Sequence, residues 1–156
     1  KRLIRPLTPI IEGAWWGNDT CWRMVLDLVR IATYCSPDGV IQESPQRKHL
    51  VMIDGLIGGE GDGPAFCTAR KCGLMLFGDN LPIADVVNAG LMGFDPQKIP
   101  LIQRSLQLEK YPLVFPDQTM GTLFCNSSVT TIKDVIEKYQ FQFKPQEGWK
   151  GKLALK

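Results

Sequence analysis

Residues 53–64, which read IDGLIGGEGDGP, hold five glycines and three acidic residues in twelve positions. Glycine loses more backbone entropy on folding than any other residue, and the like charges of Asp54, Glu60 and Asp62 repel one another. The stretch follows an apolar run of strand length, HLVMI at 49–53. We therefore expect a loop at the carboxyl end of a strand, where open α/β sheets bind their ligands.

The spacing of this glycine-acid segment fits none of the common glycine-rich motifs. The chain has no GxxxxGK[ST] phosphate loop, and the segment has neither GxGxxG spacing nor the acid spacing of an EF-hand. Three carboxylates remain, on Asp54, Glu60 and Asp62. Such oxygen ligands suit Mg²⁺, Mn²⁺ or Ca²⁺, and they also suit hydrogen bonds to sugar hydroxyls. The alternative is a solvated loop without a binding function, in which the acidic residues only keep the loop hydrated.

Helical patterns alternate with short apolar runs along the rest of the chain. The period of residues 20–35 predicts a mostly buried helix. Its polar stripe consists of Arg23, Asp27 and Arg30. Pro82 near the start and Gly93 near the end indicate a second helix over 81–95. Further helices are expected at 100–110 and 128–140.

Strands are expected at 49–53, 73–77, 111–115 and 121–126. The runs 49–53 and 73–77 do not alternate between polar and apolar residues, which is typical of inner strands covered on both faces, and we expect them to be neighbours in a mixed or parallel sheet. The expected class is an α/β fold in which a sheet of short central strands is flanked by helices.

Composition restricts the class of protein. The 156 residues, 44% of them hydrophobic and 22% charged, suit a single globular domain over residues 1–156. A net charge of +2 is too small to favour nucleic acid or an anionic membrane, and no apolar stretch is long enough to span a bilayer. Five cysteines without a CxxC pair indicate reduced thiols and a cytoplasmic location.

The segment GAWWGNDT at 13–20 is a second candidate site. Trp15 and Trp16 can form an aromatic platform beside the start of the helix, where Asn18 and Asp19 lie next to free N–H groups. Paired tryptophans also pack into cores, and we expect the core for at least one of them.

Two isolated polar residues need an explanation. Asp85 lies in an apolar helix, so its carboxylate needs a partner or acts near the helix start as a cap. His49 is the single histidine of the chain and stands just before a strand. A structural role is expected for it more than a catalytic one.

Three segments resemble a known family. GNDTCWRMVLDL, PQRKHLVMIDGLIGGEGDGP and NLPIADVVNAGLMGFDPQKIPLI are similar to the bacterial and archaeal family named domain of unknown function 362, with a weaker echo in FKPQEGWKG. The resemblance covers roughly residues 13–105 and implies that the glycine-acid segment is more than a linker. The matching positions are Asp54, Gly58, Gly59, Glu60, Gly61, Gly63, Pro64, Asp85 and Gly93.

The resemblance also implies that this chain lacks some parts that other members of the family have. Some members carry ferredoxin-type modules, but this chain has no such cysteine run, so no iron–sulfur cluster is expected in it. The chain corresponds to the C-terminal portion of a longer protein, and it opens with Lys1. It departs from the family where NLPIAD stands in place of NPVAVD, which affects the turn before Asp85.

Two functional interpretations stay open. The first is an enzyme, or part of one, in which Asp54, Glu60 and Asp85 converge and, with Asp62, hold a divalent cation or a polar, glycan-like substrate. The remaining candidate contacts to that substrate are Trp15, Trp16, Asn18, Asp19, Gly58, Gly59, Gly61 and Gly63. The second is a non-catalytic binding or scaffold module. The sequence leaves the reaction and the oligomeric state open.

Overall fold

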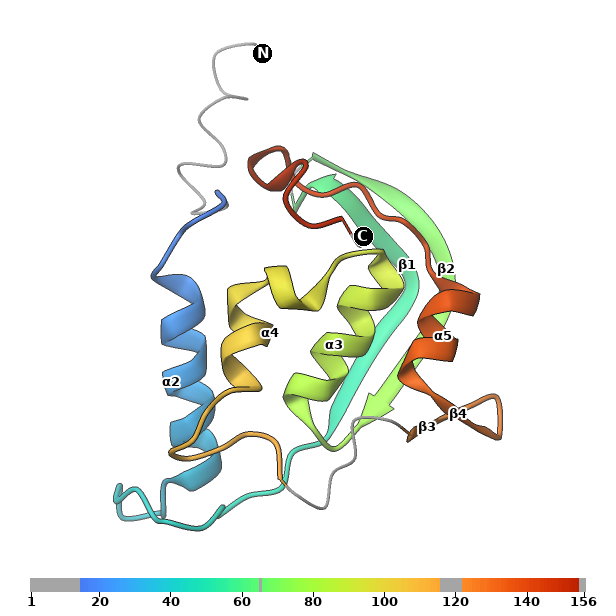
Figure 1. The fold of residues 1–156 in the computed structure, drawn as a ribbon. Coiled ribbons are helices and arrows are strands. Elements are labelled where there is room, and N and C mark those ends of the chain that lie inside the picture. The colour runs from blue at the N-terminus through green and yellow to red at the C-terminus, as the bar shows by residue number, and fades with distance from the viewer. Residues whose placement is uncertain (1–14, 65, 116–121, 155–156) are drawn as a thin grey trace.

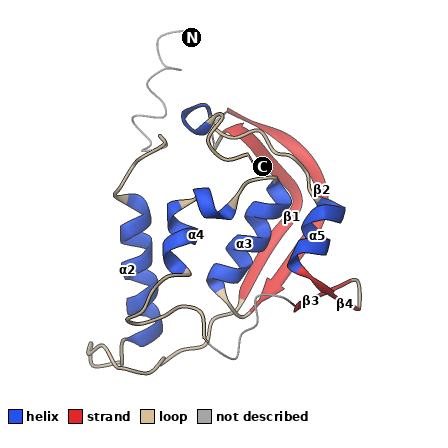
Figure 2. Cartoon of the chain, viewed as in Figure 1, coloured by secondary structure: helices blue, strands red, loops and turns tan. Residues whose placement is uncertain are grey.

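The structure is a computed structural model that describes residues 15–64, 66–115 and 122–154. Helices α2, α4 and α3 stand beside one another on the inner side of a long curved hairpin of β1 and β2, and α5 lies in front of β2 (Figures 1 and 2). The helices are α2 (Cys21–Tyr34), α3 (Leu81–Met92), α4 (Pro100–Ser105) and α5 (Ile132–Tyr139), with short 3-10 turns η1 (Pro96–Lys98) and η2 (Glu147–Trp149). The strands are β1 (Val51–Asp62), β2 (Phe66–Gly78), β3 (Thr122–Cys125) and β4 (Ser128–Thr131).

The strands form two antiparallel sheets, β1–β2 and β3–β4, which confirms the α/β class. The expected neighbours 49–53 and 73–77 do pair, with Val51 opposite Gly78 and Ile53 opposite Leu76. However, the expectations of a mixed or parallel sheet and of short central strands are wrong. β1 and β2 have 12 and 13 residues, and each has only the other as its partner among the described strands.

The glycine-acid segment is not a loop, because β1 runs through it as far as Asp62. Residue propensities predict a loop here, because glycine destabilises a strand when no other residues pack against it. The partner strand and the C-terminal residues described below provide that packing.

The hairpin contains one irregularity, a register shift between Gly55 and Ile57. In β2 the residue Gly73, with a φ of 65°, lies between the partners of these two positions. Glycine suits this backbone conformation because it has no Cβ. The alternation of β1 changes phase at the shift: Ile53 and Gly55 face inward before it, and Gly58 and Glu60 face inward after it.

The best-packed core lies between α3, α5 and the inner face of β2. Val87 and Leu91 of α3 and Val135 of α5 are its fully buried members. Gly90 permits this packing, because a Cβ there would overlap the side chain of Ile136. Asn80 caps the start of α3 by accepting a hydrogen bond from Ile83 N–H, and Gly93 ends it at a φ of 87°. The Pro82 and Gly93 signals are therefore confirmed.

The outer face of the hairpin is open, which contradicts the expected cover on both faces. We call it the outer apolar face, and it consists of Leu50, Met52, Leu56, Ile57, Met75 and Phe77. The inward and the outward positions of both strands are mainly apolar. The two runs therefore lack the polar–apolar alternation that is typical of a half-exposed sheet. The sequence run therefore indicated burial that the described residues do not supply.

Helix α2 has almost the bounds expected for it, but its burial was predicted wrongly. Leu28 is 56% exposed, and Met24 and Ile31 on the same side are exposed as well. The helix packs against α4 through the opposite side, where Leu26 and Tyr34 are buried. Apolar residues surround most of α2, but neighbouring elements cover only one side of it.

The other differences are local. Residues 111–115 form no strand, because side chains bind their carbonyl groups instead: Tyr34 Oη donates to Pro112 O (2.6 Å) and Asn80 Nδ2 to Leu113 O (3.0 Å). α4 ends at Ser105, and α5 is preceded by β4. No helix in the described ranges is both long and apolar enough to cross a membrane.

Candidate functional site

The glycine-acid strand binds the C-terminal part of the chain. Residues 141–149, which we call the strap, run along the distal half of β1 (Figure 1). Gly61 N–H donates to Lys144 O (2.9 Å), and Lys144 N–H donates to the Glu60 carboxylate (3.1 Å). Glu147 N–H donates to the Asp62 carboxylate (2.9 Å). Two of the candidate metal ligands therefore hold backbone amides of the strap.

The glycines of this strand allow the close approach. A Cβ on Gly58 would lie 2.7 Å from the ring of Phe143, and one on Gly59 would lie 3.1 Å from Cys67 Sγ. Gly61 has a φ of 84°, which favours glycine. Gly59, Gly61 and Gly63 also line an open cavity of about 370 Å³ together with strap residues. Contact with the strap therefore explains Gly58, whereas contact with the partner strand β2 explains Gly59.

Glu60 is the most enclosed of the candidate acids, with 8% of its surface exposed. Its carboxylate pairs with Arg70 Nη1 at 3.0 Å, and Lys144 Nζ lies 3.8 Å from it. The pKa of Glu60 is lowered, first by the hydrogen bond from Lys144 N–H and then by the Arg70 hydrogen bond and charge. Arg70 and the backbone amide of Lys144 therefore compensate the charge of this carboxylate.

Asp54, Glu60 and Asp85 do not converge. Asp54 is exposed on the outer face of the hairpin, whereas Glu60 faces inward because of the register shift between them. Asp85 is half-buried on α3, which packs on the inner side of β2, and burial raises its pKa. Among the described residues, no three of His, Cys, Asp or Glu are grouped to hold a metal ion. Binding of a divalent cation stays a prediction.

The candidate residues of GAWWGNDT lie at the strap's other end. Trp16 meets Trp149 edge to face, with ring centroids 5.2 Å apart, and Trp16 N–H donates to Gly148 O. Both Trp15 and Trp16 are partly exposed. Since Trp149 lines the 370 Å³ cavity, the structure brings Trp16 toward Gly59, Gly61 and Gly63.

Asn18 and Asp19 act at the start of α2. The Asn18 carboxamide oxygen accepts hydrogen bonds from Thr20 N–H (3.0 Å) and Thr20 Oγ1 (2.7 Å). Asp19 pairs with Arg23 at 2.9 Å. This hydrogen bond lowers the pKa of Asp19. Both residues therefore organise the turn that leads into the helix.

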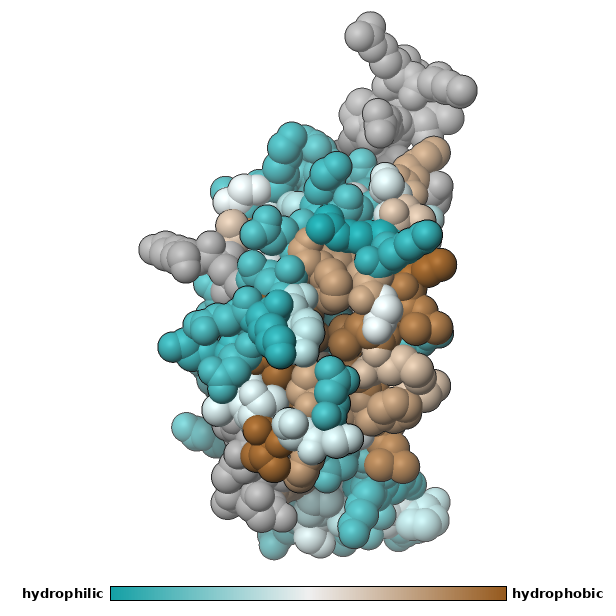
Figure 3. All heavy atoms as spheres, turned by 90° about the vertical axis from the view of Figure 1, so that its right-hand side faces the viewer, coloured by the Kyte–Doolittle hydropathy of each residue, from teal (hydrophilic) through white to brown (hydrophobic). Residues whose placement is uncertain are grey.

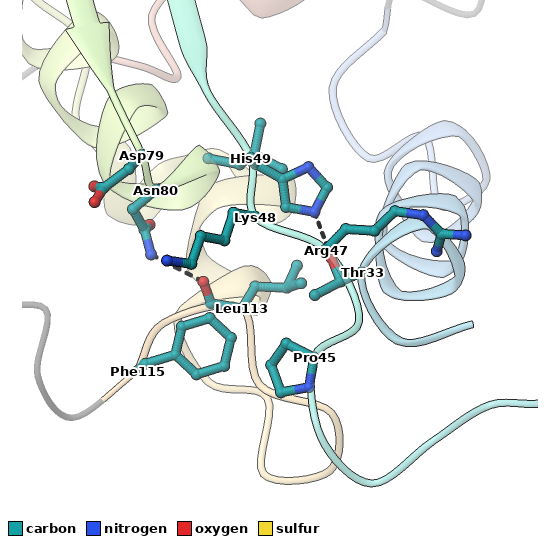
Figure 4. Close-up of a pocket in the computed structure, with 10 residues that line it drawn as sticks. Thr33, Pro45, Arg47, Lys48, His49, Asp79, Asn80, Leu113 and Phe115 are labelled. Carbon is teal, nitrogen blue, oxygen red and sulfur yellow. Dashed lines mark hydrogen bonds between the residues drawn. The ribbon is translucent and has the colours of Figure 1, made fainter. Parts of the chain in front are cut away.

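A second feature, which the sequence reading missed, is a pocket of about 320 Å³ at the junction of α2, β1 and α3 (Figure 4). We call it the basic pocket, because three consecutive basic residues, Arg47, Lys48 and His49, line one side of it. The run QRKH just before the strand is the sequence signal that could have indicated it. The remaining lining residues are Thr33, Pro45, Asp79, Asn80, Leu81, Leu113 and Phe115.

His49 is oriented by α2. Its Nε2 lies 2.9 Å from Thr33 Oγ1, and that hydroxyl donates its only proton to Val29 O (2.7 Å). Thr33 therefore accepts from His49, which fixes the proton of a neutral ring on Nε2 and leaves Nδ1 as an acceptor. This hydrogen bond ties the chain before β1 to α2.

Arg47 and Asn80 fix the walls of the pocket. Arg47 Nη1 donates to Cys35 O (2.6 Å) and Ala32 O (3.0 Å) and so caps the end of α2. Asn80 joins the start of α3 to Leu113, as described above. Figure 4 shows Lys48 extending across the pocket toward α3, while the Arg47 guanidinium points away toward α2.

Comparisons with protein-family models, with curated proteins and with solved structures find no match for this chain. Its fold and its site define it as an α/β protein whose basic pocket opens between two helices and a hairpin.

Proposed function

We propose that this protein is a binding module for a small anionic molecule, which it holds in the basic pocket. The observation that carries the proposal is Lys48, whose ammonium group extends across a cavity large enough for a small ligand. Within the described chain, no carboxylate lies within ion-pair distance of Lys48. A bound anion is the partner that this charge favours.

The electrostatics of the pocket support an anion. Lys48 supplies a positive charge inside the pocket and Asp79 a negative one, and the Arg47 guanidinium, which is directed toward α2, adds a second positive charge at the wall. The pocket also contains the start of α3, a helix of 12 residues whose dipole favours negative charge at this end; Pro82 has no N–H group there, and the N–H group of Ile83 is bound to Asn80. Lysine and helix start therefore act in the same direction.

The rest of the lining indicates the body of the ligand. Leu81, Leu113 and Phe115 present apolar surface on the side opposite the basic residues. A volume of about 320 Å³ lies near the lower end of the ~300–1,000 Å³ range of small-molecule sites. These features favour a compact aromatic or aliphatic molecule that carries one phosphate or carboxylate.

The resemblance to domain of unknown function 362 stays part of this proposal. Two of the segments that carry it, GGEGDGP and FKPQEGWKG, pack on each other as β1 and the strap. Their contact supports treating them as one structural unit. Catalysis on a glycan-like substrate, the first interpretation of the sequence, stays a prediction.

Thermal unfolding with three probes tests the proposal: inorganic phosphate, phenyl phosphate and phenylacetate, each against sodium chloride of equal ionic strength. We expect a saturable rise in Tm with at least one probe. Lys48→Ala should weaken binding by roughly tenfold or more, because hydrogen bonds to charged groups contribute ~1.5–3 kcal/mol.

Lys133→Ala is the matched control, since Lys133 is a highly exposed lysine on α5 outside the pocket. Its binding should equal that of the unaltered protein. The absence of a saturable shift with every probe, or equal affinities for Lys48→Ala and Lys133→Ala, would contradict the proposal.

A further inference from the structure

The outer apolar face of the hairpin is the largest unexplained surface. Its six side chains are between 50% and 91% exposed. Figure 3 shows the hairpin side of the molecule, where brown apolar residues gather beside the teal polar residues. The face is continuous in register, since Met52 pairs with Phe77 and the neighbouring pair is Asp54 and Met75.

The size of this face is at the upper limit of what a monomer normally leaves open. Six large side chains that are half or more exposed present on the order of 100 Å² each. The total of roughly 600 Å² lies at the upper limit of the largest apolar patch of a typical monomer. With the charged residues on the same side of the hairpin, it approaches the ~800 Å² that each partner contributes to a standard protein–protein interface.

We propose that the outer apolar face packs against the same face of a second copy, which makes the protein a two-fold symmetric dimer. A partner must cover the whole face to bury this area, and a sheet of equal size does so. Two sheets packed face to face bury their side chains in a layer about 10 Å thick. The interface is isologous, so each residue contact occurs twice.

The charges on the outer side of the hairpin favour a second copy as the occupant. Asp54 and Lys71 are exposed on the outer side of β1 and β2. Asp54 pairs in register with Met75, and Lys71 pairs with Ile57. The line between the two charged side chains therefore crosses the apolar centre of the face.

A two-fold axis through this centre exchanges the two charged positions. Asp54 of one copy then meets Lys71 of the other, and the symmetric contact repeats on the opposite side. Leu56, Ile57 and Met75 surround the axis and become buried between the two copies. A face that carried only one sign of charge would oppose this arrangement, whereas the observed pair supports it.

Sedimentation equilibrium and light scattering of the full chain up to about 100 µM test the proposal. We expect twice the monomer mass. Phe77→Lys should raise the dimer dissociation constant at least tenfold, because it places an unpaired charge in the buried apolar interface. Met24→Lys is the matched control: it changes an exposed methionine on α2, outside the face, and should leave the dimer unchanged.

A charge swap tests the arrangement without altering the apolar centre. Lys71→Asp and Asp54→Lys should each weaken the dimer about tenfold, and the double variant should recover most of the loss. Far-UV circular dichroism checks that each variant is folded. A monomer at about 100 µM, a dimer insensitive to Phe77→Lys, or a double variant weaker than both single variants would overturn the proposal.

Discussion

Asp54 and Glu60 lie on the same strand, yet their carboxylates are on opposite sides of the sheet. An even separation along a regular strand would place both on one face. The register shift between Gly55 and Ile57 reverses that relationship. One residue of shift therefore directs Glu60 to the strap and Asp54 to the outer apolar face.

Glu60 should make stability depend on pH in the acidic range. The folded-state pKa of Glu60 is lowered, so its contribution is present above the unfolded-state pKa and is lost as pH falls through the folded-state value. We expect Glu60→Gln to lower the Tm at pH 7 and to flatten the decline of Tm on acidification. A pH series of thermal melts measures this, and parallel curves for the two proteins would contradict it.

Asp85 should have the opposite effect. Burial raises the folded-state pKa of Asp85, so the stability linked to its protonated form is present below the unfolded-state pKa and is lost as pH rises through the folded-state value. Asp85→Asn should therefore raise the Tm at pH 7. The gain should shrink as the solution is acidified. A gain that is constant from pH 7 to acid would show that the charge is not its cause.

Gly58 should tolerate no side chain while the strap is in place. A Cβ at this position would lie 2.7 Å from the Phe143 ring, so we expect Gly58→Ala to cost about 1–3 kcal/mol in unfolding free energy. Gly78→Ala is the control, since Gly78 lies in the same hairpin with open space around it. Urea denaturation measures the unfolding free energy of both variants. Equal free energies would mean that Phe143 moves aside at little cost.

Two leucines of α2 should differ strongly. Leu26 is 6% exposed, and Leu26→Ala should cost about 2–5 kcal/mol because it leaves a cavity against α4. Leu28→Ala should cost less than about 1 kcal/mol, since more than half of that side chain is in solvent. Chemical denaturation of the pair checks the assignment of the two sides of the helix. A large loss for Leu28→Ala would indicate that another chain covers it.

Local signals predicted part of this fold. Pro82 and Gly93 mark the ends of α3, because such signals act through backbone groups only a few residues away. The pairing of 49–53 with 73–77 follows from their apolar content and the short connection. These features depend on residues that are close in sequence, and sequence patterns predict such local structure well.

The rest depends on distant contacts. A strand through five glycines forms because Phe143 and Lys144 pack on it, and the sequence spacing carries no sign of that contact. The basic pocket combines four separate segments, of which only the run at 47–49 is visible as a pattern. The exposed side of α2 is apolar, and hydrophobic periodicity alone cannot tell a buried side from an open one.

The strap has a consequence for the order in which the protein can acquire its shape. Lys144 follows Glu60 by 84 residues, so a ribosome finishes the glycine-acid strand long before it makes the segment that fastens it. Until then Glu60 lacks its backbone donor, and the Phe143 ring does not yet cover Gly58. A nascent chain that stops short of Phe143 would present this strand as an unprotected edge, open to proteases and to pairing with other chains.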